Sequence, residues 1–154
     1  MKSTSLIAIG LAASILLSAQ LNLKAATEGG MKFDGNWSVT LEAKVYKNPN
    51  GSMAQPYVRH FPATVKNSVF HGEIGTRGKP EWLELNGKIE VDGTADLRAD
   101  LITGAGKWNF TQGLRAPPGE GTRYSYQVVA RFEGQRGTGH STDGRTRIYS
   151  FVKD

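Results

Sequence analysis

The stretch from residue 82 to residue 101, WLELNGKIEVDGTADLRADL, contains two runs in which apolar and polar side chains alternate. Alternation with a period of two is typical of β-strands that bury one face, so the stretch predicts two strands. Between them, Asp92-Gly93 suits a tight turn, because glycine adopts positive φ without steric cost and aspartate tolerates it. The stretch is therefore expected to form a β-hairpin with one apolar face. An isolated hairpin is barely stable in water, so this face must pack against further strands.

The same alternation predicts six further strands, in the ranges 33–46, 57–65, 69–75, 124–133, 137–140 and 145–153. Pro62 interrupts one of them. Because proline donates no ladder hydrogen bond, that strand is expected either to bulge there or to lie at an edge. In the last strand the buried side stays open, since Tyr149 and Phe151 alternate with Ile148 and Val152. The segment 103–123 is predicted to be a long irregular loop.

Residues 1–26 have the composition of a secretory signal peptide, with Lys2 ahead of an apolar run and Ala25-Ala26 after it. The apolar run, about 14 residues, is too short to cross a bilayer as a helix. Neither Ala19 nor Ala25 has small residues at both preferred cleavage positions, so an uncleaved N-terminal anchor remains an alternative. We expect a periplasmic or secreted protein in which residues 27–154 form one domain.

The chain has no cysteine, which excludes disulfides and a lipid-modified cysteine after the signal. Its formal charge is +5, from 19 basic and 14 acidic residues. Without Lys2 and Lys24 the count is 17 against 14, a net charge of only +3. A balance this small argues against nucleic acid as a partner. No stable membrane insertion is expected once the signal has been cleaved.

Eight sequential antiparallel strands favour an all-β fold, an eight-stranded up-and-down β-barrel, because closure removes exposed sheet edges. A β-sandwich is the alternative fold. Short and long connections alternate along the chain, which in a barrel of this kind places the long loops together at one end. The interior of an eight-stranded barrel is either filled by side chains or large enough for one small ligand.

Several blocks of the chain resemble a family of small secreted bacterial proteins with no assigned function: FDGNWSVTLE (33–42), VFHGEIGTRGKPEWLELNGKIEVDGTADL (69–97), YSYQVVARFEGQRGTG (124–139) and the closing FVK (151–153). Relatives often carry a cysteine pair at the positions of Ala43 and Arg147, which implies that the first and last strands are neighbours. The opening Phe-x-Gly-x-Trp also resembles, more distantly, the avidin and lipocalin (calycin) barrels. That likeness implies ligand binding only by analogy of fold, and no biotin-binding or lipocalin signature is present.

Basic side chains gather toward the predicted long-loop end: Lys44, Lys47, Arg59, Arg77, Lys79, Lys107, Arg115, Arg123, Arg145 and Arg147, against Glu73, Glu81, Glu120 and Asp143. Aromatic walls are expected from Tyr57, Trp82, Trp108, Tyr124 and Tyr126. This pattern predicts a mouth for an anionic or amphipathic ligand. The candidate ligand-binding residues are Arg59, Arg77, Trp82, Trp108, Tyr124, Tyr126 and Arg147. The alternative interpretation is that the charges are simply solvated and the aromatic rings plug the barrel.

The sequence shows no pattern of metal ligands or catalytic groups. His60, His71 and His140 have no metal-ligand spacing, so neither a metal nor another cofactor is expected. There is no Gly-x-Ser-x-Gly motif and no phosphate loop, and His140 to Asp143 lie too close together on a turn to form a catalytic triad. We therefore expect a non-catalytic binding protein. The alternative is an envelope protein-interaction module with a filled barrel and no small-molecule site.

Overall fold

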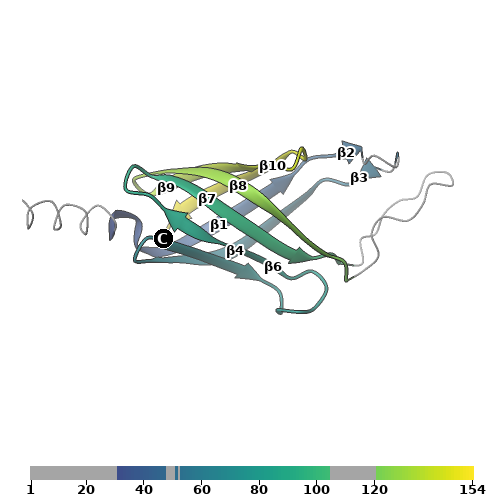
Figure 1. Ribbon diagram of the computed structural model, residues 1–154, viewed down its shortest axis with the longest axis horizontal. Helices are drawn as coiled ribbons and strands as arrows, with labels where there is room; N and C mark the ends of the chain where they lie inside the picture. The colour runs from purple at the N-terminus through teal and green to yellow at the C-terminus, as the bar shows by residue number, and fades with distance from the viewer. Residues whose placement is uncertain (1–30, 48–50, 52, 105–120) are drawn as a thin grey trace, which may run out of the picture.

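The structure, a computed structural model, describes residues 31–47, 51, 53–104 and 121–154. Eight strands form a closed antiparallel barrel, in which successive barrel strands pair and the last pairs with the first (Figure 1). They are β1 (Gly35–Ala43), β4 (Tyr57–Lys66), β5 (Val69–Ile74), β6 (Leu83–Ile89), β7 (Thr94–Ile102), β8 (Arg123–Glu133), β9 (Arg136–Ser141) and β10 (Arg147–Lys153). A 3₁₀ turn, η1 (Met31–Phe33), precedes β1, and the short strands β2 (Tyr46–Lys47) and β3 (Met53–Ala54) pair between β1 and β4. The predicted up-and-down barrel is confirmed, and the β-sandwich is excluded.

Several predicted features lie outside the described residues. They are the signal peptide (1–26) and most of the long loop, with Lys107, Trp108, Arg115 and Glu120. Within the described part of the chain, no helix is long and apolar enough to cross a membrane.

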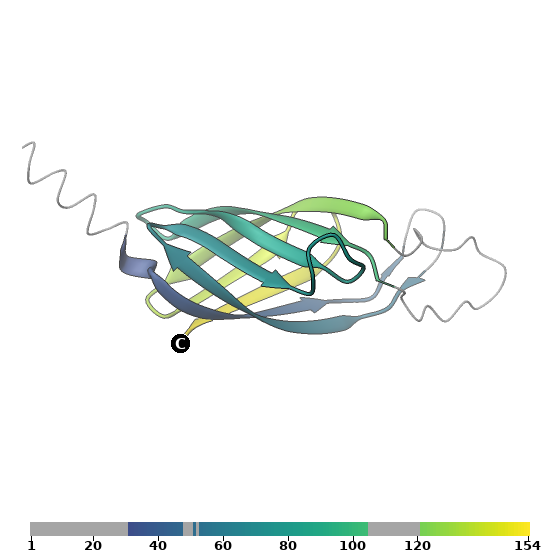
Figure 2. The same ribbon diagram turned by 90° about the horizontal axis from the view of Figure 1, so that it is seen from below.

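One end of the barrel, the closed end, carries the short connections at 67–68, 90–93 and 134–135. Asp34 stabilises the first of them by accepting hydrogen bonds from the backbone N–H groups of Asn67 (2.7 Å) and Ser68 (3.0 Å). Both ends of the described chain also lie here (Figure 2), and the N–H of Asp154 donates to the carbonyl of Asn36. Phe33 is 1% exposed and covers this end of the core.

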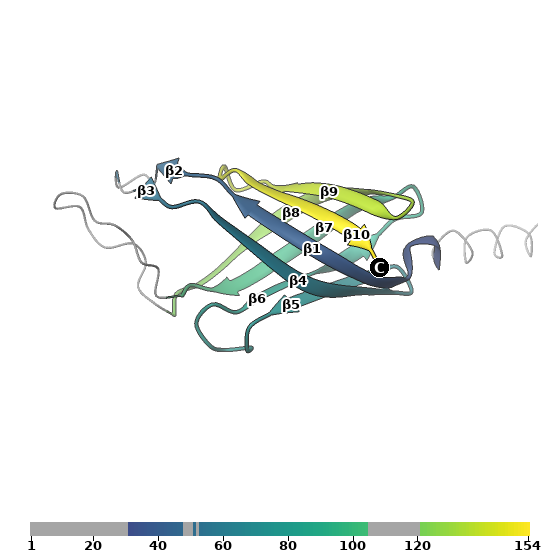
Figure 3. The same cartoon turned by 180° about the vertical axis from the view of Figure 1, so that it is seen from behind.

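The opposite end, the open end, carries the long connections 44–56, 75–82 and 103–122, together with 142–146. Figure 3 shows β2, β3 and the loop between β5 and β6 at this end. The predicted separation of short and long connections is thus confirmed.

Two details of the first predicted strand are wrong. The strand was expected over 33–46, whereas β1 spans Gly35–Ala43 and Phe33 belongs to η1. The alternation over 33–46 also predicts that Val45 is buried with the other odd-numbered apolar residues, but Val45 is 54% exposed, because β1 ends at Ala43 and the chain leaves the barrel wall there. β2 (Tyr46–Lys47) begins at the last residue of the predicted strand, and its partner β3 (Met53–Ala54) lies where the sequence predicts no strand.

Inward-facing side chains fill most of the barrel. Those below 2% exposure with the largest volumes are Trp37, Tyr149, Phe33, Phe70, Phe132, Phe151, Leu41, Leu85, Ile89, Leu97, Val39 and Val128. Near the closed end, Phe132 contacts several other aromatic rings, with its ring centroid 5.3 Å from that of Trp37 and 4.8 Å from that of Phe151. In β10 the odd residues are buried and the even ones exposed, which decides the side that the sequence leaves open. Since the chain has no cysteine, burial rather than cross-linking stabilises the barrel.

The first and last strands pair as the resemblance implies. The register of β1 and β10 places Ala43 opposite Arg147 and Leu41 opposite Tyr149. The buried side chains of β1 therefore lie next to the buried side chains of β10 where the first and last strands close the barrel.

Candidate ligand-binding site

A cavity of about 270 Å³ opens at the open end of the barrel. Its walls come from the start of β4, the approach to β6, the end of β7, the start of β8, and the start of β10 with the turn before it. They consist of Gln55, Pro56, Tyr57, Arg59, Glu81, Trp82, Leu83, Leu101, Ile102, Thr103, Gly104, Tyr124, Arg145 and Arg147. The volume lies just below the roughly 300–1,000 Å³ usual for drug-sized ligands. The space therefore suits a small molecule, or one end of a longer one.

Arg147 lies in the inward-facing row of β10 and is only 4% exposed. Its guanidinium carbon is 4.1 Å from the ring centroid of Tyr126 and 5.4 Å from that of Tyr124. Nη1 donates to both carboxylate oxygens of Asp143, at 2.9 and 2.8 Å, and Nη2 donates to the hydroxyl of Tyr124 at 2.8 Å. The buried charge is thus paired with a carboxylate and held against two aromatic faces, as a buried arginine requires.

Asp143 holds this arrangement from the turn between β9 and β10. It also accepts a hydrogen bond from the Tyr124 hydroxyl. Burial raises the pKa of Asp143, but hydrogen bonds from Tyr124 and Arg147 outweigh burial and hold that pKa below its ordinary value. For Arg147, burial lowers the guanidinium pKa, while the tyrosines and Asp143 raise it more, so the net shift is upward. Both groups are therefore charged near neutral pH.

Two tyrosines lie beneath Arg147. The hydroxyls of Tyr126 and Tyr149 are 2.6 Å apart and buried. Burial raises both phenol pKa values, so both rings are neutral at physiological pH. Together with Arg147, Asp143 and Tyr124 they form a polar layer, here called the Arg147 cluster, between the hydrophobic core and the cavity.

Two further arginines lie at the cavity. The guanidinium carbon of Arg59 is 5.7 Å from the ring centroid of Tyr57, and that of Arg145 is 5.2 Å from the ring of Tyr46. Among the described residues, no carboxylate lies within ion-pair distance of Arg59. Arg59 is therefore the cavity arginine whose charge is available to an anion, whereas the charge of Arg147 is already matched by Asp143.

The structure brings together part of the predicted site. Arg59, Trp82, Tyr124 and Arg147 all line the cavity. Tyr126 lies one layer deeper, under Arg147. Arg77 does not line it, and Trp108 cannot be placed, because it lies outside the described residues.

Arg77 lies on the outer face of the barrel. It forms ion pairs with Glu84 and, at 3.8 Å, with Glu73, and its guanidinium carbon is 5.3 Å from the ring of Trp82. The part of the loop 75–82 that carries Arg77 therefore lies over the outside of β5 and β6, whereas Glu81 and Trp82 at its end line the cavity. Trp108 lies outside the described residues.

The sequence interpretation missed the roles of Asp143 and Tyr149. Asp143 was counted only as one of four rim acids, although its position four residues before Arg147, across a turn, was a usable signal. The pairing could not be predicted because the buried side of the last strand was undecided, and only an inward-facing Arg147 needs a buried counter-ion.

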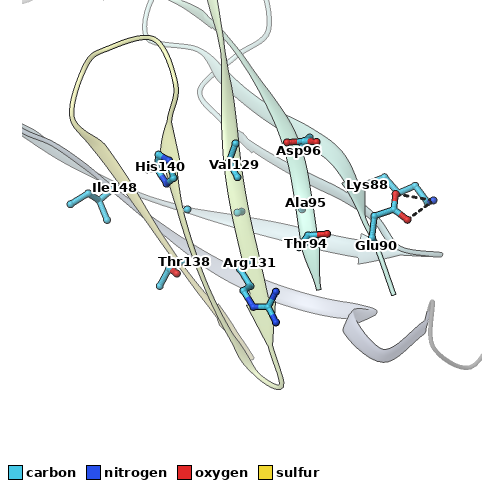
Figure 4. A pocket seen from close by; sticks show the side chains of 12 residues that line it. Lys88, Glu90, Thr94, Ala95, Asp96, Val129, Arg131, Thr138, His140 and Ile148 are labelled. Atoms are coloured by element: carbon cyan, nitrogen blue, oxygen red, sulfur yellow. Dashed lines mark hydrogen bonds and ion pairs between the residues drawn. The ribbon is translucent and has the colours of Figure 1, made fainter. Parts of the chain in front are cut away.

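A shallow hollow of about 620 Å³ lies on the outer face of β6 to β10 (Figure 4). Figure 4 shows the side chains of Asp96, Val129, Arg131 and His140 on neighbouring strands around it. Most of its lining consists of outward-facing side chains that are also exposed. The hollow lacks the buried polar groups of the cavity at the open end.

No group of three or more His, Cys, Asp or Glu side chains in the described ranges is placed to hold a metal ion. No protein-family model matches the chain, and comparisons with curated proteins and with solved structures gave no match. The resemblance to small secreted bacterial proteins therefore stays a prediction.

Proposed function

We propose that this protein is a non-catalytic binding protein of the periplasm or the extracellular space, which takes a small anionic or amphipathic ligand at the open end of its barrel. The observation that carries the proposal is the cavity: it is open, has aromatic walls, and contains Arg59 with its charge unmatched by a carboxylate in the described residues. The location rests on the composition of residues 1–26.

The walls suit a ligand with an apolar body and an anionic group. Tyr57, Trp82 and Tyr124 supply aromatic surface, and Leu83 and Ile102 supply aliphatic surface. Arg59 offers a charged donor at the same opening. The Arg147 cluster forms the base of the cavity, where its paired charges keep the polar layer in place.

A matched pair of fluorescent probes tests the proposal: anilinonaphthalene sulfonate and N-phenylnaphthylamine, which share an aromatic frame and differ in the sulfonate. The anionic probe is expected to bind more tightly. Arg59→Gln should weaken binding of the sulfonate by about tenfold, the value of one charge-assisted hydrogen bond, and leave binding of the neutral probe unchanged.

Arg131→Gln is the matched control, because Arg131 is exposed on the outer face and pairs with Glu133 at 2.9 Å. It should change neither affinity. Equal binding of the two probes, or equal loss of sulfonate binding in both variants, would contradict the proposal.

The alternative function, an envelope protein-interaction module, is favoured by one observation. The barrel is filled below the Arg147 cluster, and its outer face exposes Val58, Val129, Ile148 and Val152. The same probes separate the two functions, since an interaction module of this kind has no preference for the sulfonate and no dependence on Arg59.

A further inference from the structure

At Pro62, β4 stops pairing with β5 but continues to pair with β1. On one side of β4, the ladder with β1 is regular from Gly35 opposite Val65 to Ala43 opposite Tyr57, nine pairs without a bulge. On the other side, the ladder with β5 has only four pairs and ends at Ala63 opposite Gly72. Continuation would pair Pro62 with Glu73, and Pro62 has no N–H to donate. Of the two outcomes expected at Pro62, the bulge is absent from the ladder with β1, and β4 is not an edge strand of the closed barrel, but its pairing with β5 stops at Ala63.

The first half of β4 has a free backbone edge as a result. The two-residue turn at Asn67 and Ser68 makes Lys66 and Val69 the closing pair, so even-numbered residues of β4 direct their N–H and C=O groups toward β5. Before Pro62 these are Val58 and His60. Neither has a ladder partner on that side among the described residues. An edge of this kind is a template for an added strand.

The cavity lies where β4 and β5 separate. Its lining includes Tyr57 and Arg59 of β4 and Leu83 of β6, but no residue of β5, although β5 stands between those strands in the barrel order. β5 ends at Ile74, and Gly75, with a φ of 82°, begins the loop that folds over the outer face. A chain added along β4 would therefore lie beside the cavity.

The side chains along the edge fit an extended peptide with acidic groups. Tyr57 and Arg59 face the cavity, whereas Val58 and His60 are exposed on the outside. Alternate side chains of an added strand would reach the cavity beside Arg59. Among the described residues that line the cavity, Arg59 and Arg145 stand against one carboxylate, Glu81, while the charge of Arg147 is matched by Asp143.

A second copy of the chain fits the edge poorly. Twofold antiparallel pairing of two β4 edges, centred on residue 59 or 60, places Arg59 opposite Arg59 or His60 opposite His60, and like residues of this kind repel when charged. Centring the pair on residue 58 or 61 places Pro56 or Pro62 opposite His60, and a ladder hydrogen bond is lost. A peptide of different sequence meets neither obstacle.

We propose that the edge of β4 from Tyr57 to Pro62 binds an acidic peptide segment in extended conformation, which pairs with the backbone of Val58 and His60 and directs alternate side chains into the cavity. The proposal rests on the proposed function, because it uses the same cavity, and it names the class of ligand.

The test uses protein produced from the full chain and a capped synthetic peptide in which aspartate or glutamate alternates with valine. Two control peptides accompany it: one with lysine at every acidic position, and one with N-methyl groups on alternate backbone nitrogens, which keeps all side chains but blocks strand pairing. The acidic peptide is expected to bind. Each control should bind at least about tenfold more weakly, because each loses backbone hydrogen bonds or charge pairing.

Amide hydrogen exchange locates the contact. In the free protein the amide hydrogens of Val58 and His60 should exchange faster than those of strand residues that donate ladder hydrogen bonds. The acidic peptide should slow the exchange of both. Val58→Pro removes one edge N–H that β1 does not use, so it should weaken peptide binding, while Val58→Thr should not.

The outcomes separate this proposal from the one on which it rests. If anilinonaphthalene sulfonate binds through Arg59 but the N-methylated peptide binds as well as its parent, strand pairing is overturned and the cavity function stands. If neither the sulfonate nor any peptide binds, both are overturned. Protection of Val58 and His60 without peptide, in a protein that sediments as a dimer, would assign the edge to a second copy instead.

Discussion

Arg147 lies with its guanidinium carbon 4.1 Å from the ring centroid of Tyr126, at an inward-facing position where the rest of β10 contributes Tyr149 and Phe151. A charged group is therefore part of the barrel interior. The polar layer around it divides the barrel into a hydrophobic core and the cavity, and it makes stability sensitive to a few polar contacts.

Arg147→Met should destabilise the barrel by about 1.5–3 kcal/mol, because it removes the charge-assisted hydrogen bonds that Arg147 donates to the partly buried Asp143 carboxylate. The double variant Arg147→Met with Asp143→Asn should lose less stability, since no unpaired charge remains. Urea unfolding followed by tryptophan fluorescence measures both. A double variant less stable than Arg147→Met would contradict this account.

Acid should weaken the fold through Asp143. The pKa of Asp143 is lower in the folded state than its ordinary value of 3.8, so its contribution to stability is fully present above that value and is lost as the pH falls below it. Asp143→Asn should therefore be less stable than the parent at neutral pH, with the difference shrinking in acid. Unfolding midpoints measured across this range test the prediction, and a constant difference would count against it.

Alkaline pH should act through Tyr126 and Tyr149. Their folded-state pKa values are raised above the ordinary 10.0, first by burial, so the stability they contribute is complete below pH 10 and is lost as the pH rises above it. In a spectrophotometric titration, both phenolates should appear only as the protein unfolds. Tyr126→Phe should reduce the late part of the absorbance change. Early, reversible ionisation of all tyrosines in folded protein would refute the burial of this pair.

Two glycines with similar backbone geometry should respond differently to alanine. Gly93 and Gly78 have φ values of 90° and 81°, so alanine at either position costs about 1–2 kcal/mol of backbone strain. At Gly93 the added Cβ would also lie 2.2 Å from the carbonyl oxygen of Phe132, whereas at Gly78 it meets nothing within 4 Å. Gly93→Ala should therefore be clearly less stable than Gly78→Ala in thermal unfolding. Equal melting temperatures would be evidence against the close contact at the closed end.

A disulfide between the first and last strands should form when Ala43 and Arg147 are both replaced by cysteine. The two residues are direct partners in the ladder of β1 and β10, where Cα separations of about 4.5–5.5 Å suit a disulfide. Because the chain has no other cysteine, mass spectrometry after thiol labelling reads the result directly. Full labelling of both thiols under oxidising conditions would argue that the strands are not paired in this register.

Much of the fold could be predicted because period-two alternation reports directly which face of a strand is buried. Leu85 and Leu97 are fully buried where the alternation places them, and the Asp92-Gly93 turn has the expected positive φ at glycine. The order of short and long connections then decided which loops share an end. Each of these inferences depends only on the order of residues within a short segment or on the length of a connection.

The site was harder to predict, because it depends on where charged side chains point. Arg77 and Arg147 look alike in sequence, yet one pairs with Glu84 on the outer face and the other with Asp143 inside. The course of the loop 75–82 and the inward orientation of the odd-numbered residues of β10 decide this difference. Neither can be read from the alternation of apolar and polar residues in those segments. Pro62 was recognised as a disturbance, but its effect depends on β5, a separate strand.

Both ends of the described chain lie at the closed end, and this has a practical consequence. Residue 31 and Asp154 both leave the barrel there, away from the cavity. A tether or neighbouring domain joined at Met31 or Asp154 would thus leave the mouth facing outward, and immobilisation at either residue would not obstruct the cavity.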